Sequence, residues 1–250
     1  MDEIKQSAKG ENINQNTIIV QGDYHVGINR DGVIELIKSF GYVNKDEIID
    51  IVQDAIEHIP EGQREMPDKR IFVPAIQQLS YSTDDDILKN AYKNLLSSSM
   101  HSVKKINMHP SFITIISQLN SDEIKLLNSL PCTSLVMNPV INMRMKIGEK
   151  KGLGITQVKY FSDIGYGVCE YPEKICVYLE NLERLNLIEI PNYRTLTDKS
   201  EYEKLKNHPA ILAIKNKNFS TDSFKITYEF DEMYFNLTTF GQNFIECCKS

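Results

Sequence analysis

The sequence predicts a mainly α protein of the α+β class, and three observations lead to this prediction. Apolar residues recur at three-to-four spacing in several stretches, which is the pattern of amphipathic helices. β-Branched and aromatic residues gather in a few shorter runs, which predict strands. Of the 250 residues, 41% are hydrophobic and 25% are charged. This composition is typical of a globular protein with a substantial core, in one large domain or two ordinary ones.

Residues 1–30 are expected to hold a disordered tail followed by a β-arm. The segment Ile13–Ile28 has the β-branched residues and the glycine punctuation of a short strand or hairpin. One such strand is not stable alone in water, so it must pair with its own domain or with another copy of the chain. The Asn- and Gln-rich flank would support pairing between copies, and a homo-oligomer is the expected state. The residues expected to form the arm are Ile13, Ile18, Ile19, Val20, Gly22 and Tyr24.

Residues 31–66 are predicted to form two helices and a linker. The first helix is expected near Gly32–Phe40. The second, Asp46–Ile59, has an apolar face at three-to-four spacing and acidic residues in its first turn, where they complement the helix dipole. Pro60, Gly62 and Pro67 then interrupt the chain, as in a linker.

Residues 67–120 are predicted to form a helical core. Three amphipathic helices are expected, at Ile71–Ser80, at Ile87–Met100 and from Pro110 to Gln118. Prolines fall in the first turn of the first and third of these helices, where a helix tolerates them.

Two features of this core have both a catalytic and a structural interpretation. Asp84, Asp85 and Asp86 precede the second helix, where carboxylates complement the dipole and fan out rather than converge on a metal ion. His109 precedes the third helix and has no partner acid or nucleophile nearby in the sequence, which favours a capping or packing role. We therefore expect no catalytic residue. A nuclease or nucleotide hydrolase that uses these side chains is the enzymatic alternative.

Residues 121–250 are predicted to form the last domain. It begins with a helix at Asp122–Leu130, followed by a short strand at Val136–Met145. The next stretch, KIGEKKGLG, reads as an exposed hairpin or loop because it matches neither of the common phosphate-binding patterns. A helix at Glu173–Asn186 then runs into a strand at Leu187–Ile190.

The end of this domain resembles a winged helix. The segments LNLIEI (185–190) and FNLTTFGQNFI (235–245) fit two wing strands, joined by a long polar stretch and followed by a last helix. The resemblance to winged-helix transcription regulators lies in an LTxxGxxF pattern made by Leu237, Thr238, Gly241 and Phe244. Residues 121–250 are accordingly expected to be a winged-helix-like domain with an extended wing.

The charge of this domain favours contact with protein over contact with DNA. A DNA-binding winged helix should carry basic residues on its recognition helix. The helix Glu173–Asn186 has more acidic than basic residues, and the whole chain has a net charge of −6. A DNA-binding regulator is therefore the alternative function. The candidate contact residues are Lys174, Arg184, Lys215 and Lys217.

The sequence predicts no cofactor, no metal and no membrane span. The five cysteines include no CxxC pair and have no histidine at a zinc-ligand spacing, so free thiols are expected. No apolar run is long enough to span a bilayer. The first residues lack the basic start and apolar run of a signal peptide, so a cytoplasmic protein is expected.

Two stretches of the chain contain a set of helix motifs. The first stretch, Ile71–Leu130, contains ILKNAYKNLL and then HPSFITIISQLNSDEIKLLNSL; the second, Leu182–Phe244, contains LNLI and LTTFG. These motifs resemble the abortive infection alpha (Abi-alpha) family, a group of bacterial proteins associated with defence against phage. These are structural motifs, so the resemblance implies a role in phage defence but no catalytic residue. The expected function is non-enzymatic recognition of an unknown phage or host protein by a homo-oligomer.

Overall fold

The computed structural model describes residues 30–39, 45–147, 154–217 and 226–249. The predicted β-arm lies outside these residues, and so does most of the KIGEKKGLG loop.

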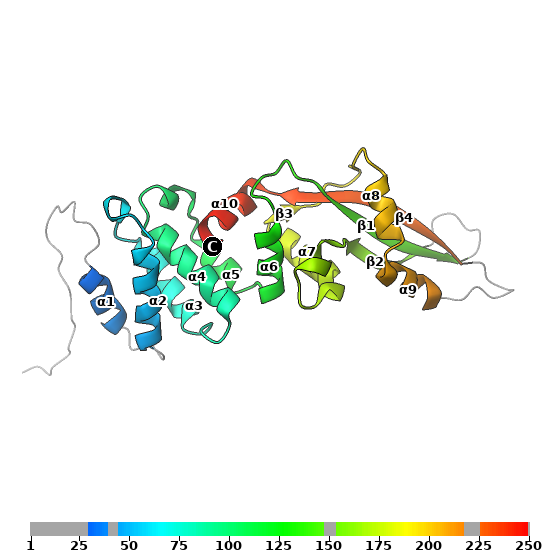
Figure 1. Cartoon of the computed structure of the whole chain (residues 1–250). Helices are drawn as coiled ribbons and strands as arrows, with labels where there is room; N and C mark the ends of the chain where they lie inside the picture. The colour runs from blue at the N-terminus through cyan, green and yellow to red at the C-terminus, as the bar shows by residue number, and fades with distance from the viewer. Residues whose placement is uncertain (1–29, 40–44, 148–153, 218–225, 250) are drawn as a thin grey trace, which may run out of the picture.

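The molecule is elongated, with helices at one end and a sheet at the other (Figure 1). α10 packs back on the helical end, and α6 lies between the two ends. The helices of the first half are α1 (Arg30–Ser39), α2 (Lys45–Glu57), α3 (Lys69–Leu79), α4 (Asp86–Ser99), α5 (Ser111–Ile116) and α6 (Ser121–Ser129). The sheet is formed by β1 (Asn138–Ile147), β2 (Gly154–Phe161), β3 (Ile188–Glu189) and β4 (Ile226–Leu237). The predicted mainly α, α+β class is confirmed.

The helical end is organised around α4. Tyr92, Leu95 and Leu96 on this helix are fully buried. Contacts run from α4 to α2, α3, α5, α6 and α10. The helix begins where its sequence predicts, because the Asp85 side chain accepts hydrogen bonds from the backbone N–H of Ile87 (2.9 Å) and Leu88 (3.1 Å). The Asp84–Asp86 run is therefore a helix start, as expected.

The sheet is antiparallel, with strand order β2-β1-β4-β3. β1 pairs with β4 along its whole length, from Asn138 opposite Phe235 to Ile147 opposite Ile226. The β1–β2 pairing is interrupted by register shifts, and Tyr160 in β2 has a left-handed backbone with φ of 60°. The Asn142 side chain accepts a hydrogen bond from the Tyr160 backbone N–H at 2.8 Å, which holds this irregular point.

The remaining helices are α7 (Ile175–Arg184), α8 (Ser200–Lys206), α9 (Pro209–Lys217) and α10 (Thr239–Cys248). Short 3₁₀ turns occur at η1 (Glu61–Gln63), η2 (Lys104–Asn107), η3 (Ile164–Gly167) and η4 (Pro172–Lys174). The stretch between β3 and β4, expected to be a long polar wing, contains α8 and α9. β3 pairs with β4 over only two residues, and the long partner of β4 is β1. The winged-helix resemblance is not confirmed.

The LNLI segment (185–188) and the LTTFG segment (237–241) contact each other. The Thr238 hydroxyl accepts a hydrogen bond from the Gly241 backbone N–H (2.8 Å) and donates one to the carbonyl of Asn186 (2.7 Å). Thr238 thus caps α10 and ties it to the end of α7. A Cβ atom at Gly241 would lie 1.9 Å from the Leu187 carbonyl oxygen, so only glycine allows this approach.

An aromatic cluster joins the HPSF segment to α10. Phe112 lies 5.2 Å from Phe240 and 5.4 Å from Phe244 between ring centroids. The His109 ring packs edge-on against Phe240 at 5.6 Å, and its Nδ1 accepts a hydrogen bond from the Ser111 backbone N–H at 3.2 Å. His109 therefore packs against α10 and bonds to the first residue of α5, and packing is one of the two roles expected from the sequence.

Among the helices of the described segments, none combines the length and the apolar character that crossing a bilayer requires.

Candidate functional site at the junction of α6 and α7

The start of α6 is a four-residue junction, Asn120 to Glu123, in which each side chain makes a different connection. Asn120 and Glu123 form a capping box. The Asn120 side chain accepts the Glu123 backbone N–H at 2.9 Å, and the Glu123 carboxylate accepts the Asn120 backbone N–H at 2.8 Å. The Ser121 hydroxyl donates a hydrogen bond to the carboxylate of Asp85, the residue that caps α4. The helical end and α6 are thus fixed to each other through their caps.

Asp122 fastens α6 to the segment that leads into α7. Its carboxylate accepts backbone N–H groups of Glu170 and Tyr171, both at 2.8 Å, and the Tyr178 hydroxyl at 3.0 Å. Burial alone would raise the pKa of this carboxyl, but these hydrogen bonds, with one from Lys125, outweigh it and lower the pKa to about 2. The Asp122 carboxylate is therefore ionised at neutral pH, and it connects α6 to α7 and to the segment before α7.

Glu123 is the next residue, and its environment raises the pKa of its carboxyl where that of Asp122 lowers it. The side chain is 2% exposed. Burial raises the pKa of Glu123 above its usual range, although hydrogen bonds from the Asn120 backbone and the Asn181 side chain oppose the shift. Two adjacent carboxylates thus bind α7 from the same turn with opposite pKa shifts.

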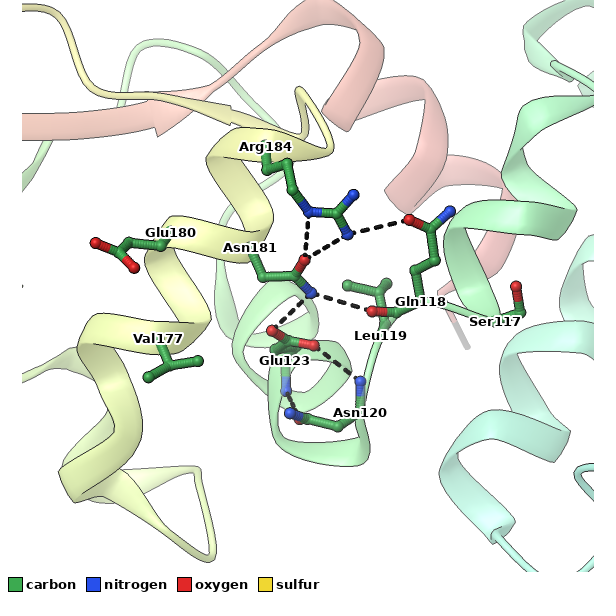
Figure 2. A pocket seen from close by; sticks show the side chains of 9 residues that line it. All are labelled: Ser117, Gln118, Leu119, Asn120, Glu123, Val177, Glu180, Asn181 and Arg184. Carbon is green, nitrogen blue, oxygen red and sulfur yellow. Dashed lines mark hydrogen bonds between the residues drawn. The ribbon is translucent and has the colours of Figure 1, made fainter.

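A hydrogen-bonded network connects Glu123 to the outer face of α7 (Figure 2). The Asn181 amide donates to Glu123 Oε1 at 2.9 Å and to the Gln118 carbonyl at 3.1 Å. Arg184 donates to Asn181 Oδ1 from Nε (3.1 Å) and from Nη2 (2.7 Å), and Nη2 also donates to the Gln118 side chain at 3.0 Å. The guanidinium of this exposed residue is therefore held in one orientation.

The network forms one wall of a pocket of about 560 Å³ between α7 and the α5–α6 turn. A second hollow of about 350 Å³ lies on the other side of α7, against β2 and α9, and is lined by apolar side chains such as Phe161, Tyr166 and Ile211. Val177 and Glu180 line both hollows. Val177 is 61% exposed and is therefore an apolar side chain on the ridge between a polar and an apolar hollow.

Comparison with known proteins identifies the family. The sequence profile described as "Abortive infection alpha" matches residues 43–248. The chain belongs to the abortive infection alpha family. No curated protein matches the sequence. A solved structure of an uncharacterized protein from the hydrocarbon-degrading marine bacterium Alcanivorax borkumensis SK2 is similar with 12% identity and a TM-score of 0.37, covering 60% of this chain and 96% of that one. A likeness this loose carries no argument.

Several of the segments that resemble the Abi-alpha family form contacts between helices that are distant in the sequence. The sequence NSDE (120–123) connects α4, α6 and α7. LNLI and LTTFG form the contact between α7 and α10. In this chain, the segments that resemble the family therefore include residues that connect α4, α6, α7 and α10.

The candidate contact residues lie on three elements, η4, α7 and α9. Arg184 is in the pocket, and Lys174 lies at the opposite end of α7 with its ammonium over the Tyr171 ring, 4.8 Å from the centroid. Lys215 is on α9, where it donates to the Lys206 carbonyl at 3.1 Å and lies over the Phe230 ring. Lys217 ends the same helix. Their role in binding remains a prediction.

The lysines of α8 and the residue before it are paired with carboxylates. Lys199 and Lys206 contact Glu232 at 2.8 Å and 2.7 Å, and Lys204 contacts Glu201 at 2.5 Å. A surface that binds phosphates needs basic charge that its own acidic residues do not neutralise. These pairs therefore give the DNA-binding alternative no support.

Sequence reasoning found Arg184 but missed the residues that hold it. Asp122 and Glu123 read as ordinary acidic residues of a helix start, which they also are. The signal that could have found Glu123 is the capping-box spacing from Asn120. Asn181 carried no signal, because its partners come from a distant part of the chain. No group of three histidine, cysteine or acidic side chains is placed to hold a metal ion in the segments that the structure covers.

Proposed function

We propose that this Abi-alpha protein acts in abortive infection without enzymatic activity, by recognising a phage or host protein on the outer face of α7. Membership of the family over residues 43–248 supports the role in defence. The observation that carries the choice of surface is Val177, which is 61% exposed on the ridge between two hollows. Because Val177 lines both hollows, a partner protein would place side chains on either side of it, as at an anchor residue of a protein interface.

The chemistry beside Val177 fits a protein partner. Arginine is enriched at the centres of protein interfaces, and an apolar anchor beside a polar rim is the usual arrangement. Arg184 is fixed by its hydrogen bonds to Asn181 and Gln118, so little side-chain freedom is lost when a partner contacts it. The face of α7 is thus ordered before binding.

The proposal includes self-association. The arm predicted at Ile13–Ile28 would add a strand to another copy and produce a homo-oligomer in the cytoplasm. This part rests on the sequence alone, and the solution mass tests it.

The direct test of the binding surface is site-specific photo-crosslinking in infected bacteria. A photo-reactive amino acid replaces Val177 in one variant and Ile155 in a control variant; Ile155 is 58% exposed on β2, close to the exposure of Val177. We expect a discrete crosslinked band from position 177 and none from position 155. Identical patterns from both positions, or no crosslink from position 177, would contradict the proposed surface.

A further inference from the structure

A second surface lies at the helical end, in a groove between the segment after α2 and the segment after α4. The Glu65 backbone N–H donates to the Met100 carbonyl, and the Ser102 N–H donates to the Gln63 carbonyl, both at 2.8 Å. These bonds hold the two segments side by side, in the loops between α2 and α3 and between α4 and α5 (Figure 1). The Asn107 side chain donates to Glu246 of α10 at 2.8 Å, which fixes η2. Hydrogen bonds between the two segments and to α10 thus hold the backbone around the groove in place.

The groove has a volume of about 630 Å³ and a largely apolar lining. Met66, Ile71, Ile106 and Met108 contribute to it, together with two prolines. Ile106 is 84% exposed and Met66 57% exposed, and Val103, three residues before Ile106 in the chain, is 63% exposed. Methionine side chains adapt to the shape of an incoming apolar group. Large apolar side chains that remain in water around a preformed groove indicate a surface that another molecule covers.

The charge around the groove is opposite to that of the whole chain. Residues 61–71 and 101–108 contain five basic side chains, Arg64, Lys69, Arg70, Lys104 and Lys105, against three acidic ones, Glu61, Glu65 and Asp68. The whole chain has a net charge of −6.

Two of the acidic side chains at the groove are already engaged. Asp68 pairs with Arg70, and Glu65 pairs with Lys105. Lys69 and Lys104 are exposed and form no salt bridge with any residue that the structure describes. Lys69 follows the lining residue Asp68, and Lys104 precedes the lining residue Lys105, so two positive charges without a carboxylate partner in the described segments adjoin the groove in the sequence.

We propose that this groove binds an acidic peptide segment of a partner protein, with large apolar side chains in the groove and carboxylates beside Lys69 and Lys104. A peptide segment can place side chains into a concave groove, whereas a flat bilayer cannot, and a nucleic acid offers phosphates without apolar side chains. The partner's acidic residues would also speed its association with the basic rim. This surface is separate from the face of α7, and the proposal does not depend on the function assigned to that face.

The test is a selection of random peptides displayed on yeast, with the purified full-length chain as bait. We expect the enriched peptides to combine acidic residues with leucine, isoleucine or phenylalanine. Ile106→Asp should weaken their binding by about tenfold or more, as loss of an anchor in a hot spot does. Lys69→Gln with Lys104→Gln should weaken it and reduce its salt dependence. The matched control is Ile155→Asp, at an exposed isoleucine of β2, which should bind normally.

Three outcomes would overturn the proposal. The first is enrichment of no acidic and apolar class of peptide. The second is equal binding of the enriched peptides to the wild type and to Ile106→Asp, when circular dichroism shows both folded. The third is binding of the chain to vesicles of phosphatidylserine and phosphatidylcholine, through Ile106 and Lys104, without binding of any selected peptide, which would assign the surface to an anionic membrane.

Discussion

At the scale of single residues, Gly241 is the position where one added methyl group has the largest expected effect. Its Cβ would lie 1.9 Å from the Leu187 carbonyl oxygen, which is backbone and cannot rotate away. We predict that Gly241→Ala lowers the free energy of unfolding by about 3 kcal/mol, the upper part of the range for overpacking. Urea denaturation followed by circular dichroism measures this.

The control for Gly241 is Gly32 in α1, where an added Cβ meets nothing within 4 Å. Gly32→Ala should stabilise the protein by up to about 1 kcal/mol, because alanine favours the helix. Equal effects of the two substitutions would contradict the close approach of α10 to the end of α7.

The lowered pKa of Asp122 leads us to predict a loss of folding stability in acid. Its pKa is lowered to about 2 in the folded protein, from an ordinary value of 3.8. The unfolded chain therefore takes up the proton first as the pH falls. The contribution of Asp122, roughly 2 kcal/mol, is complete above pH ~5 and is lost between about pH 5 and pH 2. Asp122→Asn should flatten this part of the profile of unfolding free energy against pH.

Glu123→Gln is the matched comparison on the neighbouring residue. Because burial raises the pKa of Glu123, the folded protein holds this proton more tightly than the unfolded chain does. Its contribution is lost as the pH rises through the raised pKa, which is the opposite direction. Glu123→Gln should therefore leave the acid loss in place. An acid limb that flattens in the Glu123 variant and persists in the Asp122 variant would show that the two roles are assigned the wrong way round.

At the scale of elements, the start of α10 depends on Thr238. Its hydroxyl caps the helix through Gly241 and also bonds to the Asn186 carbonyl. Thr238→Ala should lower the free energy of unfolding by about 1–2 kcal/mol, as loss of an N-cap does. Thr239→Ala, one residue later and inside the helix, should change it by less than about 0.5 kcal/mol. Thermal unfolding of the two variants distinguishes these outcomes.

The elements that could be predicted from the sequence are those with strong periodicity or a clear cap. α2, α3, α4 and α6 begin and end within two residues of their expected positions, because each has an apolar stripe and a polar start. β2 was missed because register shifts and the left-handed Tyr160 break the alternation that marks a strand. α8 is short and rich in charge, so it read as part of a polar wing. α9 begins with the apolar run PAILAI, and this short run was missed between charged neighbours.

The candidate site was predicted only in part, for a similar reason. Arg184 could be named because a charged residue on an amphipathic helix is visible in the sequence. The pocket that holds it requires Gln118 and Glu123, which lie 66 and 61 positions earlier in the chain, so no local pattern connects them. Contacts made by the fold between distant residues have no signal in one sequence.

At the scale of the whole molecule, the proposed homo-oligomer depends on the arm. We predict that the full chain has a defined oligomeric mass by light scattering and that a chain beginning near Asp31 is a monomer. α1 begins at Arg30 and the other helices of the helical end follow it in the chain, so the helical end should remain folded in the shorter chain. A full chain that stays monomeric at high protein concentration would contradict the proposed self-association.

We propose that the outer face of α7 recognises a protein during phage defence. The plating efficiency of phage on bacteria that express the chain tests this recognition most directly. Val177→Arg adds bulk and charge on this face. Glu173 lies four residues before position 177 and Glu180 three residues after it, so the new arginine has oppositely charged neighbours and the helix should be preserved. We predict that wild type and Ile155→Arg reduce plating equally and that Val177→Arg, expressed at the same level, does not. Full protection by Val177→Arg would contradict the claim.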